Sequence, residues 1–199
     1  MTTLLGGDHF IAKSEYTDKL KEYSDLFNWF DVLQSSGTLE DYCRKNAISV
    51  PEISTILARC KNFSELIDAQ NERYIKAKML SEKSYLDTIL KDCDPNILLD
   101  EDQRRVVLTD EDYCLVVAGA GAGKTTTVAA KVKYLVDKQG VDPKQILVIS
   151  FTNKAVNELK QRIIGELHID CPIATFHSTG NVNSLITIDY CLDIPAIVR

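Results

Sequence analysis

The fold is decided by the stretch Cys114-Leu115-Val116-Val117-Ala118-Gly119-Ala120-Gly121-Ala122-Gly123-Lys124-Thr125-Thr126-Thr127-Val128. Its first four residues form a short apolar run, which predicts a buried strand. A loop made only of alanine and glycine follows, and Lys124 and Thr125 then open a segment with helical periodicity. The apolar residues of that segment are Val128, Val132, Leu135 and Val136. The stretch therefore predicts a strand, a glycine loop and a helix in succession.

This succession is typical of loops that bind nucleotide phosphates. Gly121 and Gly123 can adopt backbone angles that let several N–H groups converge on one anion. The helix N-terminus adds a partial positive charge. Lys124 can reach the β- and γ-phosphates, and the Thr125 hydroxyl can ligate Mg²⁺. We therefore expect a nucleotide and Mg²⁺ as cofactors, bound by Ala118, Gly119, Ala120, Gly121, Ala122, Gly123, Lys124, Thr125 and Thr126, with Lys124 and Thr125 as catalytic residues. The alternative is a flexible turn before an ordinary helix, and Ala118, where the strict pattern has glycine, weakens the motif.

Composition bounds the possible classes of protein. The 199 residues are 45% hydrophobic and 26% charged, which is typical of a globular protein. A formal net charge of −6 does not indicate a generally basic nucleic-acid surface, although a local basic groove is compatible with it. The cysteines show no metal-binding spacing and predict reduced thiols. The first residues lack a signal-peptide pattern and no apolar run reaches membrane-spanning length, so we expect a cytoplasmic protein without a membrane partner.

The first part of the chain, residues 1–94, predicts an all-helical accessory region. Residues 14–33 carry an aromatic and aliphatic stripe at helical spacing, which fits a core face or a face that docks a protein partner. Residues 38–57 predict a helix, a turn and a helix, with Ser49 and Glu52 as a capping box. Packed structural helices explain this segment better than a DNA-reading module, because its second helix offers few donors for base edges. A longer helix is expected over residues 64–90.

The second part, residues 95–199, predicts an α/β domain. A short helix over residues 99–107 leads into the glycine loop, and residues 146–150 and 173–176 are short apolar or β-branched runs typical of buried parallel strands. A helical segment separates these strands. Alternation of strands and helices predicts an open parallel sheet, with ligands bound at the carboxyl ends of the strands.

Several blocks of this part resemble superfamily 1 DNA helicases of the UvrD/Rep kind, with the helicase IV branch closest. Residues 99–105, with Gln103, are similar to the adenine-reading Q motif, and residues 118–125 are similar to helicase motif I, in which alanine commonly stands at the position of Ala118. Residues 150–159 are similar to motif Ia, and residues 174–180 to motif Ib. The resemblance implies a RecA-like P-loop sheet, of which residues 95–199 would be the N-terminal part.

The resemblance also implies roles for individual residues. Gln103 offers the donor and the acceptor that adenine N6 and N7 require, although a plain surface amide is the alternative. Contacts with single-stranded DNA are implied for Phe151, Thr152, Asn153, Phe176 and His177. Aromatic side chains suit such contacts because every base presents a π-face. Either phenylalanine could instead belong to the core, since both stand at strand ends.

The sequence lacks the second acidic motif of such a motor, an Asp-Glu pair after an apolar strand. The run from Ile186 to Asp189 imitates its start, but Tyr190 stands where glutamate is needed. We therefore expect part of an ATP-dependent 3′-to-5′ DNA helicase that translocates on single-stranded DNA, truncated before the Walker B motif. A non-motor ATP-binding or interaction module, whose N-terminal helices dock a protein partner, is the alternative. A small P-loop kinase is disfavoured by Gln103 and by the block after residue 150.

Overall fold

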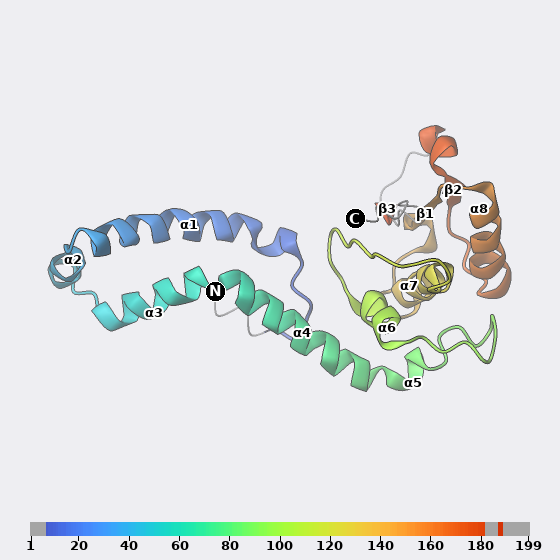
Figure 1. The fold of residues 1–199 in the computed structure, drawn as a ribbon, viewed down its shortest axis with the longest axis horizontal. Coiled ribbons are helices and arrows are strands. Elements are labelled where there is room, and N and C mark those ends of the chain that lie inside the picture. Colours follow the sequence, from blue (N-terminus) through green and yellow to red (C-terminus); the bar gives the residue numbers. More distant parts are fainter. Residues whose placement is uncertain (1–6, 182–186, 189–199) are drawn as a thin grey trace. The chain divides into compact units, whose positions relative to one another are not determined.

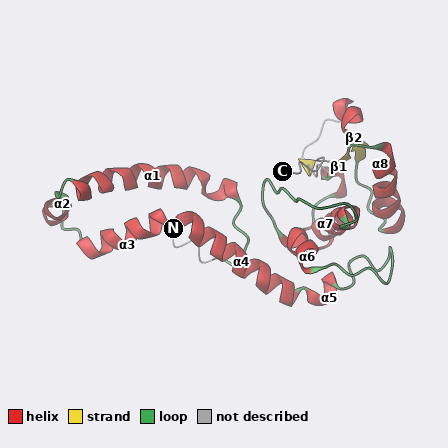
Figure 2. Cartoon of the chain, viewed as in Figure 1, coloured by secondary structure: helices red, strands yellow, loops and turns green. Residues whose placement is uncertain are grey.

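The computed structural model describes residues 7–181 and 187–188. It is mostly helical, with a small parallel sheet (Figure 2). The chain divides into two compact units, one made of residues 1–77 with 110–113 and the other of residues 78–109 with 114–199. None of the helices in the described parts of the chain is both long and apolar enough to cross a bilayer.

The first unit consists of helices α1 (Lys13–Ser35), α2 (Leu39–Lys45), α3 (Val50–Lys61) and most of α4 (Phe63–Ser81), which Figure 1 shows in blue to green. α1 and α3 contact each other, and α2 contacts both. One buried cluster joins these helices through Phe30, Leu39, Cys43, Ile53 and Leu57, and a smaller one joins Ile11, Phe63 and Ile67. Burial of these side chains supplies the main stabilising free energy of the unit.

Most helices predicted for this region are confirmed. The helix expected over residues 14–33 is α1, and α2 and α3 form the predicted pair around a turn in which Ala47 has a positive φ of 53°. The capping box predicted at Ser49 is wrong, because Ser49 is the N-cap of α3 but its side chain accepts no capping hydrogen bond. The long helix expected over residues 64–90 is interrupted after Ser81, and a short helix α5 (Lys83–Leu86) follows.

The second unit contains the sheet and the helices that cover it. After α5 come α6 (Glu101–Leu108), α7 (Lys124–Gln139), η1 (Pro143–Gln145), β1 (Leu147–Ser150), α8 (Asn153–Lys160), the π-helix η2 (Gln161–Glu166), β2 (Ile173–Thr175), η3 (Phe176–Asn181) and β3 (Thr187–Ile188). The strand order is β2-β1-β3, and both ladders are parallel, with Ser150 opposite Thr175. The strands expected over residues 146–150 and 173–176 are confirmed. Asp189 and Tyr190 lie outside the described residues.

The strand predicted at residues 114–117 is wrong, because these residues form a loop without regular secondary structure. Both edges of β1 are occupied, by β2 and β3, so β1 offers no free edge for a further strand. A strand without a neighbour leaves its backbone N–H and C=O groups to solvent. In agreement with this, Leu115 is 74% exposed and Val117 is 85% exposed. The apolar pattern was correct, but within the described residues the segment has no β-pairing.

The core of this unit lies between α6, α7, α8 and the sheet. It includes Val107, Val128, Val132, Ile146, Val148, Leu159 and Ile163, all almost fully buried. Lys131 is also buried, and its Nζ donates to the carbonyl oxygens of Val107 at 2.9 Å and Thr109 at 2.6 Å. These bonds satisfy carbonyl groups at the C-terminal end of α6, which lack partners within the helix. The α6–α7 contact therefore fixes the helix on each side of the glycine loop.

Candidate nucleotide-binding site

The glycine loop has the backbone geometry that its sequence predicts. Gly121 and Gly123 have φ angles of 78° and 73°, in the left-handed region that favours glycine. Gly123 is the N-cap of α7, so the loop leads directly to the helix N-terminus, where N–H groups lack intrahelical acceptors. Within the loop, the Ala122 N–H donates to the Gly119 carbonyl at 3.3 Å. The loop is therefore arranged to offer backbone donors and the positive end of a helix dipole to an anion.

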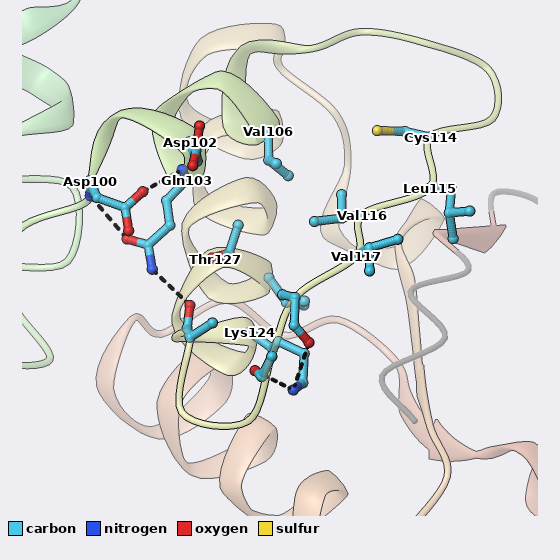
Figure 3. Close-up of a pocket in the computed structure, with 14 residues that line it drawn as sticks. Asp100, Asp102, Gln103, Val106, Cys114, Leu115, Val116, Val117, Lys124 and Thr127 are labelled. Carbon is cyan, nitrogen blue, oxygen red and sulfur yellow. Dashed lines mark hydrogen bonds between the residues drawn. The ribbon is translucent and has the colours of Figure 1, made fainter. Parts of the chain in front are cut away.

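Lys124 folds back over this loop. Its Nζ donates to the carbonyl oxygens of Gly119 at 3.0 Å and Ala118 at 3.4 Å (Figure 3). These bonds hold the ammonium group beside the loop backbone, on the side that lines the pocket. Phosphate oxygens are stronger partners for an ammonium group than neutral carbonyls are, because their hydrogen bonds are charge-assisted.

Gln103 reaches from α6 to the same loop. Its Oε1 accepts from the Asp100 N–H at 3.1 Å, and Asp100 in turn caps α6 by accepting from the Gln103 N–H at 2.8 Å. The Nε2 atom donates to the Ala122 carbonyl at 3.2 Å, as Figure 3 shows. A Cβ added to Gly123 would lie 2.5 Å from this Nε2 atom. Gln103 is thus no plain surface amide, because its side chain joins the start of α6 to the loop.

A pocket of about 290 Å³ lies between α6, α7 and the segment 114–119. Its polar lining includes Gln103 and Lys124, and its apolar wall includes Val106, Val116 and Val128. A flat apolar group with polar edges, such as a nucleobase, suits a cavity with this lining. The pocket lining also includes Asp100, Asp102, Cys114, Leu115, Val117, Ala118, Gly119, Ala122 and Thr127.

Several predicted binding residues lie beside this pocket rather than in its lining, namely Ala120, Gly121, Gly123, Thr125 and Thr126. Thr125 and Thr126 belong to the first turn of α7 and are half-buried. In the described part of the chain, no group of three or more His, Cys, Asp or Glu is placed to hold a metal ion. Ligation of Mg²⁺ by the Thr125 hydroxyl stays a prediction, and such an ion would take its remaining ligands from phosphate oxygens and water.

The aromatic residues that follow β1 and β2 come together. The ring of His177 lies 6.4 Å from the ring of Phe151 and 6.4 Å from that of Phe176, both in edge-to-face orientation. Phe151 is 61% exposed and Phe176 67% exposed, so neither belongs to the core. We call these three side chains the aromatic rim. Exposed aromatic rings at the carboxyl ends of parallel strands are available for stacking.

The two polar residues predicted beside the rim have different positions. Thr152 is the N-cap of α8, and its Oγ1 accepts from the Ala155 N–H at 3.2 Å. Asn153 is the exposed first residue of α8. The hydroxyl of Thr152 therefore has a structural role in the helix, whereas the Asn153 amide is turned to solvent.

One contact at the site was not anticipated from the sequence. Arg162 Nη1 donates to Thr126 Oγ1 at 2.6 Å. The two residues are 36 positions apart, and neither periodicity nor a motif relates them. Cys114 was predicted as the first residue of a buried strand and as a reduced thiol, whereas in the structure it lines the pocket.

A glycine-rich loop at the N-terminus of a helix, beside a small parallel sheet, defines an α/β class of protein. Comparison with known proteins narrows this class. Residues 99–184 match the model of the UvrD/REP helicase N-terminal domain. This segment is therefore similar to the N-terminal domain of UvrD/REP helicases, the family whose motifs the sequence resembles.

Curated relatives agree with the family model. A probable DNA helicase II homolog of Mycoplasma capricolum is 43% identical over 84 residues, which are 41% of this chain and 12% of the relative. The ATP-dependent DNA helicase UvrD1 of Mycobacterium tuberculosis is 40% identical over 84 residues, or 41% of this chain and 11% of the relative. The ATP-dependent DNA helicase PcrA of Staphylococcus epidermidis is 41% identical over 83 residues, or 40% and 11%. The matched segment thus spans about a tenth of the length of these helicases.

Proposed function

We propose that residues 95–199 are the N-terminal part of a RecA-like domain that binds ATP and Mg²⁺ for an ATP-dependent 3′-to-5′ DNA helicase. The observation that carries the proposal is the convergence of Gln103 and Lys124 on one glycine loop at a helix N-terminus. The relatives UvrD1 and PcrA, which are named as ATP-dependent DNA helicases, support the same assignment. Residues 1–94 would be a helical accessory region.

In this proposal the adenine ring enters the pocket beside Gln103. The amide of Gln103 has one further donor hydrogen, and its oxygen has one further lone pair, after the two bonds described above. The phosphates lie over the loop N–H groups, Lys124 neutralises the β- and γ-phosphates, and the Thr125 hydroxyl ligates Mg²⁺. Bound Mg²⁺ would supply Lewis-acid polarisation of the γ-phosphate.

Single-stranded DNA would lie against the aromatic rim. The rings of Phe151, Phe176 and His177 would stack on successive bases without regard to sequence, and Asn153 would hold a phosphate. None of the described strands ends in an Asp-Glu pair that could position the attacking water. We therefore expect these residues alone to bind nucleotide with little turnover, so brisk DNA-stimulated ATP hydrolysis by the chain would contradict this part of the proposal.

The proposal is tested by titrating the chain with a fluorescent MgADP analogue. Lys124→Ala should weaken binding by about 10- to 150-fold, because a hydrogen bond to a charged group contributes about 1.5–3 kcal/mol. Lys144→Ala is the matched control, since Lys144 is an exposed lysine of η1 and does not line the pocket. Equal affinity of the parent chain and the Lys124→Ala variant would overturn the proposed site.

A further inference from the structure

One continuous helical segment joins the aromatic rim to the loop helix. α8 begins directly after Thr152, next to Phe151 of the rim, and continues without interruption into η2. Its inner side is anchored by Leu159 and Ile163, both fully buried. These anchors belong to the same buried cluster as Val128 of α7, so the segment and the loop helix pack tightly against one shared core.

Arg162 makes the polar contact between this segment and α7. The guanidinium donates to Thr126 Oγ1 at 2.6 Å, and both residues are half-buried. A charged donor in a partly desolvated place makes a stronger hydrogen bond than a neutral donor does. Thr126 lies in the first turn of α7, directly after Lys124 and Thr125. The contact therefore fixes the turn whose N–H groups face the anion site.

The local geometry around Arg162 is also unusual. Arg162 lies within a π-helix, a wider turn than the α-helix that precedes it. π-turns are rare and frequently occur at functional sites. A regular α-helix would continue the hydrogen bonding of α8, so the wider turn is a local departure at the residue that contacts Thr126.

We propose that Arg162 is a positioning residue that couples the nucleotide site to the DNA-binding rim, through its hydrogen bond to Thr126. Binding of DNA at the rim shifts α8 and η2, and the Arg162–Thr126 bond passes this shift to the first turn of α7. By thermodynamic linkage the two ligands then change each other's affinity by the same factor. This inference rests on the proposed function, because it requires both ligands to bind.

The experiment measures the affinity of the chain for the fluorescent MgADP analogue, with and without an oligothymidylate of about 16 nucleotides, a typical upper length for one single-strand binding site. For the parent chain we expect the oligonucleotide to change the nucleotide dissociation constant by about 5-fold or more. Thr126→Val, which replaces the hydroxyl by a methyl group of similar size, and Arg162→Gln should each reduce this factor to about 1. Thr126→Ser keeps a hydroxyl and should retain the coupling.

Two controls separate coupling from damage to the fold. Lys160→Gln removes a positive charge from the exposed last residue of α8 and should leave the coupling factor as in the parent chain. The double variant Arg162→Gln/Thr126→Val should show no greater loss than either single variant, because both remove the same bond. Thermal unfolding checks that each variant is folded.

The outcomes are distinguishable. If the parent chain couples the two ligands and Thr126→Val couples them equally, the inference is overturned while the proposed function stands. The same holds if the parent chain binds both ligands without any mutual effect. If the parent chain binds no nucleotide, the proposed function is overturned, and the inference with it.

Discussion

The contact between Gln103 and Gly123 leads to a quantitative prediction about the loop. Gly121 and Gly123 both have left-handed backbone angles, but they differ in their surroundings. A Cβ on Gly121 would meet nothing within 4 Å, whereas a Cβ on Gly123 would lie 2.5 Å from Gln103 Nε2. The same substitution by alanine therefore tests backbone strain alone at Gly121, and strain together with displacement of a side chain at Gly123.

The magnitudes follow from these contacts. A left-handed conformation costs a non-glycine residue about 1–2 kcal/mol, so Gly121→Ala should weaken nucleotide binding roughly 5- to 30-fold if the free loop relaxes. Gly123→Ala should weaken nucleotide binding by the same strain and by a further amount, because Gln103 must also be displaced. Gln103 is flexible enough to move away, but moving breaks its bonds to Asp100 and Ala122. At a net ~1 kcal/mol for each bond, the additional loss is about 2 kcal/mol, or roughly 30-fold.

A double-mutant cycle with Gln103→Ala isolates the contact. In the Gln103→Ala background no glutamine side chain is displaced, so Gly123→Ala should weaken nucleotide binding only as much as Gly121→Ala does. The assay is titration with the fluorescent MgADP analogue, with thermal unfolding to confirm folding. The reasoning is refuted if Gly121→Ala and Gly123→Ala weaken nucleotide binding equally in the parent background. It is also refuted if their losses of affinity still differ in the Gln103→Ala background.

Further predictions concern the rim, the thiols and the first unit. Phe151→Ala should weaken oligothymidylate binding by about 5- to 150-fold, because one lost stacking contact costs ~1–3 kcal/mol. Fluorescence anisotropy measures this affinity, and an unchanged value would show that the aromatic rim is not part of the DNA site. Burial, and to a smaller extent a hydrogen bond to a glutamate, raises the pKa of Cys93 to about 11, so this thiol is protonated at pH 7.5. Cys93 should therefore be alkylated more slowly than the exposed Cys114, and its rate should rise as the pH approaches 11. Mass spectrometry should find Cys114 modified first and protected by MgADP, and the reverse order would contradict the assignment. At the start of α1, the Asp112 carboxylate accepts from the Ser14 N–H at 2.7 Å and from the Ser14 hydroxyl at 3.0 Å. Asp112→Ala should therefore destabilise the first unit by ~1 kcal/mol in urea unfolding. An unchanged midpoint would show that solvent replaces this cap.

Features that depend on short stretches of sequence were predictable. The positive φ angles of Gly121 and Gly123 follow from a loop in which glycine alternates with alanine, and the start of α7 follows from the apolar spacing after Lys124. The strands at residues 146–150 and 173–176 were also predictable, because short apolar runs next to a helical pattern are typical of buried parallel strands. In each case the signal and the structure lie within a few residues of each other.

Contacts between distant segments were not predictable in the same way. The sequence gives Gln103 a role through its resemblance to a motif, yet nothing in its neighbours places its amide against the Ala122 carbonyl. Arg162 stands on a helix that reads as ordinary, and its bond to Thr126 depends on a π-turn that no periodicity signals. Such contacts depend on how α6, α7 and α8 pack, which is a property of the folded core rather than of any one helix.

The segment 114–117 shows most clearly where local inference ends. Its apolar pattern correctly identifies residues with a preference for strands, but a strand is defined by hydrogen bonds to a neighbour. Since β1 already pairs with β2 and β3, a strand formed by Leu115 and Val117 would need a different edge to complete its backbone bonds. Within the described residues the segment is therefore an irregular loop that is exposed except at the half-buried Val116, although it still lines the pocket between α6 and α7. The contacts at the glycine loop come instead from α6, through the bond of Gln103 to the Ala122 carbonyl, and from the direct continuation of the loop into α7, whose first turn Arg162 contacts at Thr126.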